Sequence, residues 1–278
     1  MPEYNRTIYD FNGRFTLNDT TTNPDQFVLV QSNSFLDTIA ENTEGGRITD
    51  AGIVDYGTKF GKGVVKVPIT LYASSIGKMN DLIQDLKEAF NPDLLEADPT
   101  YGLDAGGGGY HPLKWTETVG ETPRDFMIYL KSMETPRVAL DKLAGLVRGS
   151  ELTLKAQDPR KYLQASSSLS GSGTATNAGT YPTPVIITIT ATGTTLTNLQ
   201  ITNSTRNESV YVTTALSIGQ SLVIDTRKHS CKLNGVERRD YLGNNTKWMQ
   251  LDPGANTITI ANGTNATIST VWHSAWPL

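Results

Sequence analysis

Residues 184–189 read Pro-Val-Ile-Ile-Thr-Ile, and residues 219–226 read Gly-Gln-Ser-Leu-Val-Ile-Asp-Thr. Both are strand-sized apolar runs bounded by turn residues, and similar runs recur about every 8–12 residues toward the carboxy terminus. Pairs of apolar residues two positions apart, with mostly polar neighbours, occur at Ile187 and Ile189, Leu199 and Ile201, Val210 and Val212, Leu222 and Ile224, and Ile258 and Ile260. Short strands with one apolar face at this spacing predict a self-standing β-sandwich.

The composition bounds the class of protein. The 278 residues suffice for two ordinary domains, and 37% hydrophobic with 19% charged residues is typical of a globular protein with few charges. The formal net charge of −4 argues against nucleic-acid binding, because no basic stripe remains once the acidic residues are counted. The short basic pair Arg238-Arg239 lies between Glu237 and Asp240 and is interpreted as a solvated turn.

The sequence also argues against membrane and disulfide classes. Residues 1–6 contain no apolar core of a signal peptide, and no run of 18 apolar residues occurs, so we expect no membrane insertion. Cys231 is the single cysteine and cannot form an internal disulfide. Stability is therefore expected to come from packing alone.

A stretch of small residues marks the clearest change in composition. It reads Ser166-Ser167-Ser168-Leu169-Ser170-Gly171-Ser172-Gly173-Thr174, which is typical of a flexible linker or a long loop. Just before it, Asp158-Pro159 is expected to end a strand. We place the division at about residue 165, which gives domains 1–165 and 166–278.

The first domain is predicted to combine strands with one helix. Residues 65–72 alternate apolar and wetter positions, and because Pro68 cannot donate to a ladder, this strand is expected to run along an edge or to carry a bulge. Ile76, Met79, Leu82, Ile83, Leu86 and Phe90 then fall at helical spacing. Ser74 or Ser75 can cap this helix, and Asn91-Pro92 ends it. Further strands are predicted around residues 126–131 and 152–156.

Long polar segments separate these elements. Residues 31–62 and 97–118 show little periodicity and are expected to be binding loops, or loops that become ordered in an assembly. The run Gly106–Gly109 is followed by Tyr-His-Pro instead of the Lys-Ser/Thr of a phosphate loop, so it is interpreted as a mobile loop. Residues 138–147 are compatible with a short helix or a strand.

No metal or cofactor site is predicted. His111, His229 and His273 are the only histidines, and none has the spacing of a metal site. A Cys231–His229 dyad is conceivable because the two residues lie two positions apart, but we interpret it as a small apolar thiol near a surface imidazole.

No catalytic residue is predicted, and the chain is not expected to be an enzyme. Asp225, Glu237, Asp240 and Asp252 are spread over turns, and nothing marks two of them as the facing pair that glycoside hydrolysis needs.

The tryptophans raise the question of a lectin-like site, because exposed aromatic rings can stack on sugars. Trp248 and Trp272 lie in strand-like runs and are expected to help fill the core. Trp276 lies near the terminus and is expected to be freer, so it is the candidate saccharide-stacking residue.

Several short segments of the sequence, taken in their order along the chain, resemble the distal tail protein family of long-tailed, siphovirus-type bacteriophages. Residues 152–162 (Leu-Thr-Leu-Lys-Ala-Gln-Asp-Pro-Arg-Lys-Tyr) resemble the family's junction motif, a strand that ends in Asp-Pro before a basic residue and tyrosine. The successive strands of its carboxy-terminal domain resemble residues 219–226, Leu233-Asn234-Gly235, Trp248, Leu251 and residues 253–258. The resemblance is weak over residues 60–90 and good over residues 150–278.

This resemblance implies a mainly β chain with two parts. The first would be a tail-tube-like β-barrel or sandwich with one flanking helix, and the second a galectin-like β-sandwich. The first part would form a hexameric ring that links the tail tube to the tail-tip hub and host-adsorption apparatus. Implied partners are copies of the chain itself, the tail tube protein, the hub protein and the tape-measure protein. The place implied is the tail tip or baseplate of the virion, assembled in the host cytoplasm.

Two alternatives stay open beside the structural ring protein. One is a carbohydrate-binding adaptor that recognises a host-surface saccharide, and receptor-binding proteins are further candidate partners. The other is a glycoside hydrolase, which would need a carboxylate whose replacement abolishes cleavage. A mainly β chain without catalytic groups favours the scaffold, and long polar loops beside an edge strand favour subunits that complete one another's sheets.

Overall fold

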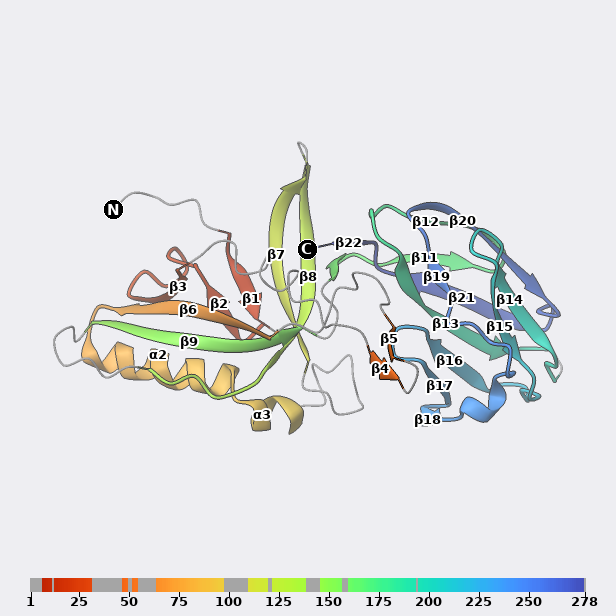
Figure 1. Ribbon diagram of the computed structural model, residues 1–278, viewed down its shortest axis with the longest axis horizontal. Coiled ribbons are helices and arrows are strands. Elements are labelled where there is room, and N and C mark those ends of the chain that lie inside the picture. The colour runs from red at the N-terminus through yellow and green to blue at the C-terminus, as the bar shows by residue number, and fades with distance from the viewer. Residues whose placement is uncertain are drawn as a thin grey trace. The chain divides into compact units, whose positions relative to one another are not determined.

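The computed structural model describes residues 7–11, 13–31, 47–49, 52–54, 64–97, 110–119, 122–138, 146–156, 160–193 and 195–277. The chain divides into two compact units, residues 1–161 and 162–277 (Figure 1). We call them unit 1 and unit 2. Both are built mainly from antiparallel strands, so the predicted mainly β class is confirmed.

Unit 1 is a twisted antiparallel sheet with the strand order β2-β1-β7-β8-β9-β6-β3 (Figure 1). These strands are β1 (Tyr9–Phe11), β2 (Phe15–Leu17), β3 (Gln26–Val30), β6 (Val64–Ala73), β7 (His111–Val119), β8 (Thr122–Ser132) and β9 (Val147–Ala156). β4 (Arg47–Thr49) and β5 (Gly52–Val54) form a separate hairpin. Strand β10 (Arg160–Leu163) spans the division between the units.

The two ends of this sheet path meet at Asn18, directly after β2. The Asn18 backbone N–H donates to the Val28 carbonyl (2.7 Å), and the Val30 N–H donates to Asn18 Oδ1 (2.8 Å). The Asn18 amide group also donates to the Thr7 carbonyl (3.0 Å). The side chain therefore replaces part of the missing ladder between β2 and β3, and the sheet closes on itself as the barrel interpretation requires.

Helix α2 (Ile76–Ala89) packs against β6, β3 and β2. Ser75 caps it, since its hydroxyl accepts from the Lys78 N–H at 3.3 Å, and Met79, Leu82, Leu86 and Ala89 form its buried face. The predicted end is confirmed: the helix closes at Phe90, and a second short helix, α3 (Pro92–Ala97), begins at the proline.

Aromatic residues anchor the end of α2 in the core of unit 1. The Phe90 ring is fully buried and stacks on Phe11, with centroids 4.4 Å apart, while Phe15 meets it edge-on at 6.0 Å. The Ser132 hydroxyl of β8 donates to the Phe90 carbonyl at 2.7 Å. The helix is therefore fixed to the sheet by ring packing and by a hydrogen bond to its last carbonyl.

The expected edge position of the strand around Pro68 is wrong. β6 lies between β9 and β3, and its register with β9 runs without a bulge from Val64 to Tyr72. Pro68 is tolerated because the β3 ladder ends beside it. The Gln31 N–H donates to the Pro68 carbonyl (3.0 Å) at the end of this ladder. Because proline has no N–H, the return hydrogen bond from residue 68 is missing, but only this last pair loses it.

Part of the predicted long loops is strand. Residues 111–118 of the segment 97–118 belong to β7, which pairs with β8 from His111↔Leu130 to Val119↔Thr122. β4 and β5 lie within the segment 31–62. The glycine run 106–109 lies outside the described residues, as do residues 139–145 of the ambiguous segment 138–147. Val147 begins β9, and this strand and β8 confirm the strands predicted at residues 152–156 and 126–131.

Unit 2 is a sandwich of two antiparallel sheets. One has the order β11-β21-β13-β16-β17-β18 with β19 beside β13, and the other has the order β12-β20-β14-β15. The strands are β11 (Ser167–Ser170), β12 (Gly173–Asn177), β13 (Thr183–Ala191), β14 (Leu199–Asn203), β15 (Glu208–Val212), β16 (Ser221–Asp225), β17 (Ser230–Leu233), β18 (Val236–Glu237), β19 (Gln250–Leu251), β20 (Gly254–Ala261) and β21 (Ala266–Trp272), with a 3-10 turn at Arg239–Tyr241. A last strand, β22 (Ala275–Pro277), lies outside these two sheets and pairs with β10.

The core of unit 2 follows the predicted inward pairs. Both members of four pairs are at most 2% exposed, and in the fifth pair Ile258 is buried while Ile260 packs against the core partly buried. Period-2 alternation identified these residues because one face of each sheet is buried and the other is wetter.

The linker prediction for residues 166–174 is wrong. Ser167–Ser170 form β11, which pairs with β21, and Gly173–Asn177 form β12, which pairs with β20 in the opposite sheet. Gly171, at φ 74°, provides the turn between them. Small side chains do not prevent backbone pairing, so a composition typical of linkers here builds one edge of each sheet.

The closure at Asn18 yields a stability prediction. Asn18→Ala removes an acceptor from the Val30 N–H and places alanine at φ 64°, so we expect a loss of about 2–4 kcal/mol in the free energy of unfolding of unit 1. Urea denaturation followed by the fluorescence of Trp115, the only tryptophan of unit 1, measures it.

Two further variants separate the causes of that loss. Asn18→Gly permits the positive φ but lacks the amide, whereas Asn18→Asp keeps the acceptor for Val30. We expect Asn18→Asp to retain more stability than Asn18→Gly. Equal stability of the wild type and Asn18→Gly would contradict the proposed closure.

Candidate functional site

Trp276, the sequence candidate for sugar stacking, is not a free ring. It lies in β22 and is only 8% exposed. The expectation that it is freer because it lies near the terminus is wrong, since β22 pairs with β10 as a strand of the fold. Little of the indole is therefore accessible for stacking on a sugar.

The other two tryptophans of unit 2 contribute to its core. Trp272 is 4% exposed, and its indole N–H donates to the Thr176 carbonyl at 3.1 Å. Trp248 packs partly buried against the core, and its ring stacks on His229 with centroids 4.8 Å apart. Trp272 lies in β21, as its strand-like run predicted, whereas Trp248 packs against the core from outside a strand, because β19 begins only at Gln250.

The Cys231 thiol is fully buried in the core of unit 2. Burial, followed by the nearby carboxylates Glu237 and Asp240, raises the pKa of this thiol to about 11. A thiol with this pKa is almost wholly protonated near neutral pH, and the His229 ring is engaged with Trp248. The geometry therefore favours an inert core cysteine over a nucleophilic dyad.

The candidate carboxylates are held separately by local partners. Asp225 accepts from the backbone N–H groups of Arg227 and Lys228, at 2.9 and 3.1 Å. Asp240 pairs with Arg238 and Glu237 with Arg239, whereas Asp252 pairs with Arg206. Among the residues that the structure describes, no group of three or more His, Cys, Asp or Glu could hold a metal ion.

The sandwich of unit 2 has two different ends. At one end the chain enters and leaves: the Leu163 N–H donates to the Ser274 carbonyl (3.0 Å), and His273 Nδ1 lies 2.8 Å from the Leu163 carbonyl. We call this the junction end. At the other end, three segments connect successive strands: residues 192–198 join β13 to β14, residues 213–220 join β15 to β16, and residues 262–265 join β20 to β21. We call this the free end.

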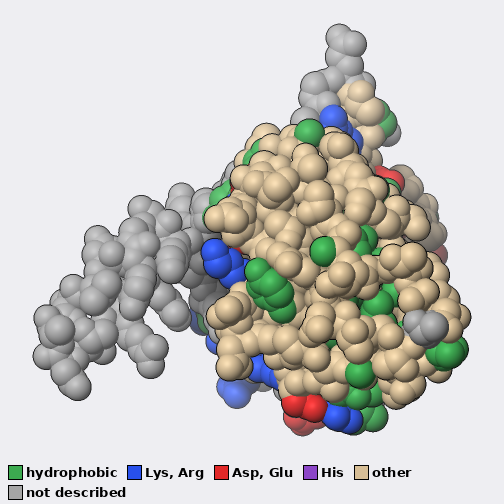
Figure 2. All heavy atoms as spheres, turned by 90° about the vertical axis from the view of Figure 1, so that its right-hand side faces the viewer, with side chains coloured by type: hydrophobic (Ala, Val, Ile, Leu, Met, Phe, Trp, Pro, Cys, Tyr) green, Lys and Arg blue, Asp and Glu red, His purple; other side chains and the backbone are tan. Residues whose placement is uncertain are grey.

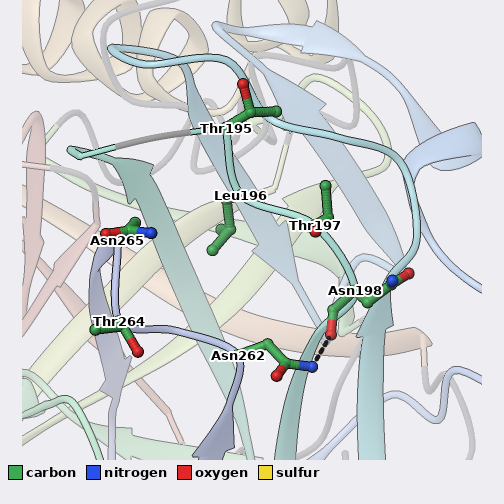
Figure 3. A pocket seen from close by; sticks show the side chains of 7 residues that line it. All are labelled: Thr195, Leu196, Thr197, Asn198, Asn262, Thr264 and Asn265. Atoms are coloured by element: carbon green, nitrogen blue, oxygen red, sulfur yellow. Dashed lines mark hydrogen bonds between the residues drawn. The ribbon is translucent and has the colours of Figure 1, made fainter.

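The free end contains a hollow of ≈ 320 Å³, lined by residues 195–198 and by Asn262, Thr264 and Asn265 (Figure 3). Leu196 is 4% exposed, and its side chain points into the space between the two lining segments. The Asn262 amide group donates to the Asn198 carbonyl at 2.9 Å. Sequence analysis did not single out these residues, although their connecting segments contain no charged or aromatic side chain, which is a signal that it could have used.

A second feature is an apolar patch on unit 1, formed by Ile76, Leu146 and Val147. These side chains are 67%, 43% and 37% exposed. They lie at the same end of the sheet, because the Ala73 N–H donates to the Leu146 carbonyl, Val147 pairs with Tyr72, and Ile76 begins α2 just beyond β6. Three exposed aliphatic side chains at one end of a sheet make this end a candidate for contact with another protein.

No helix within the described ranges is long and apolar enough to cross a membrane. Three features of the described residues can be examined for function: the apolar patch of unit 1, the uncharged hollow at the free end of unit 2 and its hydrogen-bonded junction end.

Residues 178–276 match the family model described as the siphovirus-type tail component, C-terminal domain. This match over the C-terminal part of the chain agrees with the sequence resemblance to the distal tail protein family of siphovirus-type bacteriophages. No curated protein matches the chain in sequence.

The comparison with solved structures shows a fold shared with the Dit protein of phage SPP1. The crystal structure of the Dit protein of phage SPP1, described as a paradigm of the hub adsorption apparatus in phages that infect Gram-positive bacteria, matches with a TM-score of 0.56 at 16% identity. The match covers 97% of this chain and 98% of that chain. Two structures of the phage p2 baseplate in its activated conformation, with Sr and with Ca, match with TM-scores of 0.46 and 0.45 at 7% identity, each covering 95% of this chain and 97% of that chain.

The buried thiol can be tested by its reactivity. Because the pKa of Cys231 is raised to about 11, we expect native protein at about pH 8 to react with a thiol reagent only as fast as unit 2 unfolds, and urea-unfolded protein to react at once. Spectroscopic titration with a disulfide reagent measures both rates. Rapid labelling of the native protein would contradict burial of the thiol.

The junction end is expected to respond to pH. Burial lowers the pKa of His273 below its ordinary value of 6.5, although hydrogen bonds to Leu163 and Ala165 partly oppose this. Below about pH 6.5 the unfolded chain takes up the proton more readily than the folded chain, so stability is lost as the pH falls. Urea denaturation at about pH 7 and about pH 5 measures the loss.

The matched control for this pH effect is His273→Asn, whose amide group can replace the Nδ1–H as donor to the Leu163 carbonyl. It does not titrate in this range, so its loss of stability between the two pH values should be smaller than that of the wild type. Equal losses in the two proteins would assign the pH dependence to other groups.

Proposed function

We propose, from the match of residues 178–276 to a siphovirus-type tail component, that this chain is a structural component of a phage tail or baseplate. We propose that copies of the chain form a closed ring, hexameric by analogy with the implied family architecture, that links the tail tube to the tail-tip hub and host-adsorption apparatus. Its axial opening passes DNA and the tape-measure protein. The ring belongs to the virion and assembles in the host cytoplasm.

The observation that carries this proposal is the distribution of exposed apolar side chains. Among the described residues, the exposed large hydrophobic side chains belong to unit 1, except Ile218 and Val236. Burying such side chains between subunits contributes about 25 cal/mol per Å² of apolar surface, before the costs of association. Unit 1 is therefore the part suited to permanent contacts between copies, and the apolar patch is our candidate contact.

Unit 2 fits the role of a domain on the outside of such a ring. The family model covers it, and its strand order is that of a two-sheet sandwich, which suits the galectin-like domain proposed from the sequence. The net charge of −4 suits an assembly with a DNA passage, because a basic lining would hold the nucleic acid. The alternative of sugar stacking on Trp276 is not favoured, since this ring is buried.

The ring predicts a mass of about 180 kDa in light scattering, six times the 30.2 kDa chain. We expect Ile76→Glu combined with Leu146→Glu to lower this mass, because two charges would have to be buried at the subunit contact. The matched control is Ile218→Glu, which changes a similarly exposed side chain on unit 2 and should keep the assembled mass.

Electron microscopy of the same samples tests closure directly. Rings in the wild-type and Ile218→Glu proteins, and separate particles in the double variant, would support the proposal. A strictly monomeric wild type at high concentration would overturn it. Rings that persist in the double variant would instead move the subunit contact away from the apolar patch.

A further inference from the structure

We infer that the hollow at the free end of unit 2 is a binding site for a neutral saccharide. This site is distinct from Trp276 and does not depend on ring formation. Its volume of ≈ 320 Å³ lies at the lower end of the range of about 300–1,000 Å³ that small-ligand sites occupy. It is therefore large enough for part of a carbohydrate chain and open enough for that chain to continue into solvent.

The chemistry of the lining indicates the class of ligand. Thr195, Thr197 and Thr264 supply hydroxyl groups, and asparagines supply amide groups that both donate and accept. Leu196 supplies an apolar floor. A sugar ring presents the complement, because its hydroxyl groups need donors and acceptors while its C–H faces need an apolar contact.

The absence of charge favours a neutral ligand. Residues 192–198, 213–220 and 261–267 contain no Asp, Glu, Lys, Arg or His. On the face of the molecule at the β14–β15 end of unit 2, charged side chains lie mainly at the margin, and most of the surface is neither charged nor hydrophobic (Figure 2). A phosphate- or carboxylate-bearing polymer would find no cation in these segments to offset its desolvation.

Hydrogen bonds hold the two sides of the hollow in place. The N–H groups of Thr192 and Gly193 both donate to the Asn265 carbonyl, at 2.8 and 3.4 Å, and Leu196 and Leu216 exchange two backbone hydrogen bonds of 2.9 Å. Asn198 and Asn262 adopt φ of 53° and 60°, a conformation that asparagine tolerates better than most residues. Little conformational entropy is therefore lost when a ligand binds.

The hollow lies at the end of unit 2 away from its chain connection to unit 1. The chain enters and leaves unit 2 at the junction end, so the free end carries no covalent connection to unit 1. The three connecting segments contain no aromatic residue for stacking, so a single site is expected to bind weakly through hydrogen bonds. A weak site suits reversible contact with a repetitive surface polymer.

Ligand-observed saturation-transfer NMR of the full-length protein can detect such weak binding. The probes are lactose, maltotriose and chitotriose as neutral oligosaccharides, with sialyllactose as the charged counterpart of lactose. We expect transfer to at least one neutral probe, and no stronger transfer to sialyllactose than to lactose. No transfer to any neutral probe, or transfer only to the charged one, would overturn the inference.

Variants then locate the site. Thr197→Arg and Thr264→Arg place a long charged side chain at exposed positions of the hollow, and each should weaken binding by about tenfold or more. The matched control is Thr174→Arg on β12, an exposed threonine of the same unit outside the lining, which should leave binding unchanged. Thr197→Ala with Thr264→Ala tests the hydroxyl groups should an arginine variant fail to fold.

Binding that survives all the hollow variants would place the sugar elsewhere and overturn the assignment. Light scattering on the same samples keeps this result separate from the proposed ring, because Thr197 and Thr264 belong to unit 2 and the apolar patch belongs to unit 1. An assembled protein that binds no saccharide refutes the site alone. A monomeric protein that binds a neutral saccharide refutes the ring alone.

Discussion

Unit 1 depends on one side chain, because a sheet that does not close exposes two edges to other chains. Asn18 lies between those edges and hydrogen bonds with Val28, Val30 and Thr7. The backbone of Asn18 adopts a left-handed conformation, which ends β2 and changes the direction of the chain. Its short side-chain amide then hydrogen bonds with β3 at Val30. Closure at this point then fixes the surface on which α2 and the stacked rings of Phe11 and Phe90 pack.

Asparagine has a comparable role in unit 2. Asn256 is fully buried; its Oδ1 accepts from the Asp252 N–H at 2.9 Å, and its amide group donates to the carbonyls of Asp252 and Gly254. The Asn203 amide group donates to the Gln250 carbonyl (2.7 Å) and to Asn256 Oδ1 (3.2 Å). Amide groups that satisfy both donors and acceptors stabilise buried turns without charge, which explains how a chain so poor in charged residues fixes its turns.

Alternating apolar residues made the strands and much of the core of unit 2 predictable, since that period reflects one buried face. Alternation gave no information where a strand is buried on both faces or where a strand pairs through its backbone without apolar side chains. Met127 and Tyr129 of β8 are buried as well as Phe126, Ile128 and Leu130, so both faces of this strand are covered and its burial follows no alternation. The serine-rich segment paired because ladders use backbone groups, and Trp276 became buried because β22 pairs with a strand far away in the sequence. Neither the hollow nor the apolar patch has a sequence motif, because each is assembled from separate segments by the fold.

The two surfaces differ in a way that suits different kinds of contact. Exposed aliphatic side chains gain free energy only when water is removed from them, so the apolar patch is suited to a contact that is made once and kept. The hydroxyl and amide groups of the hollow are already hydrated, and exchanging water for a sugar changes their free energy little, so such a contact can form and break repeatedly. The proposed ring would need the first property for its subunit contacts, and the inferred saccharide site would need the second. Because the apolar patch belongs to unit 1 and the hollow to unit 2, each with its own core, substitutions at one surface are expected to leave the packing around the other unchanged.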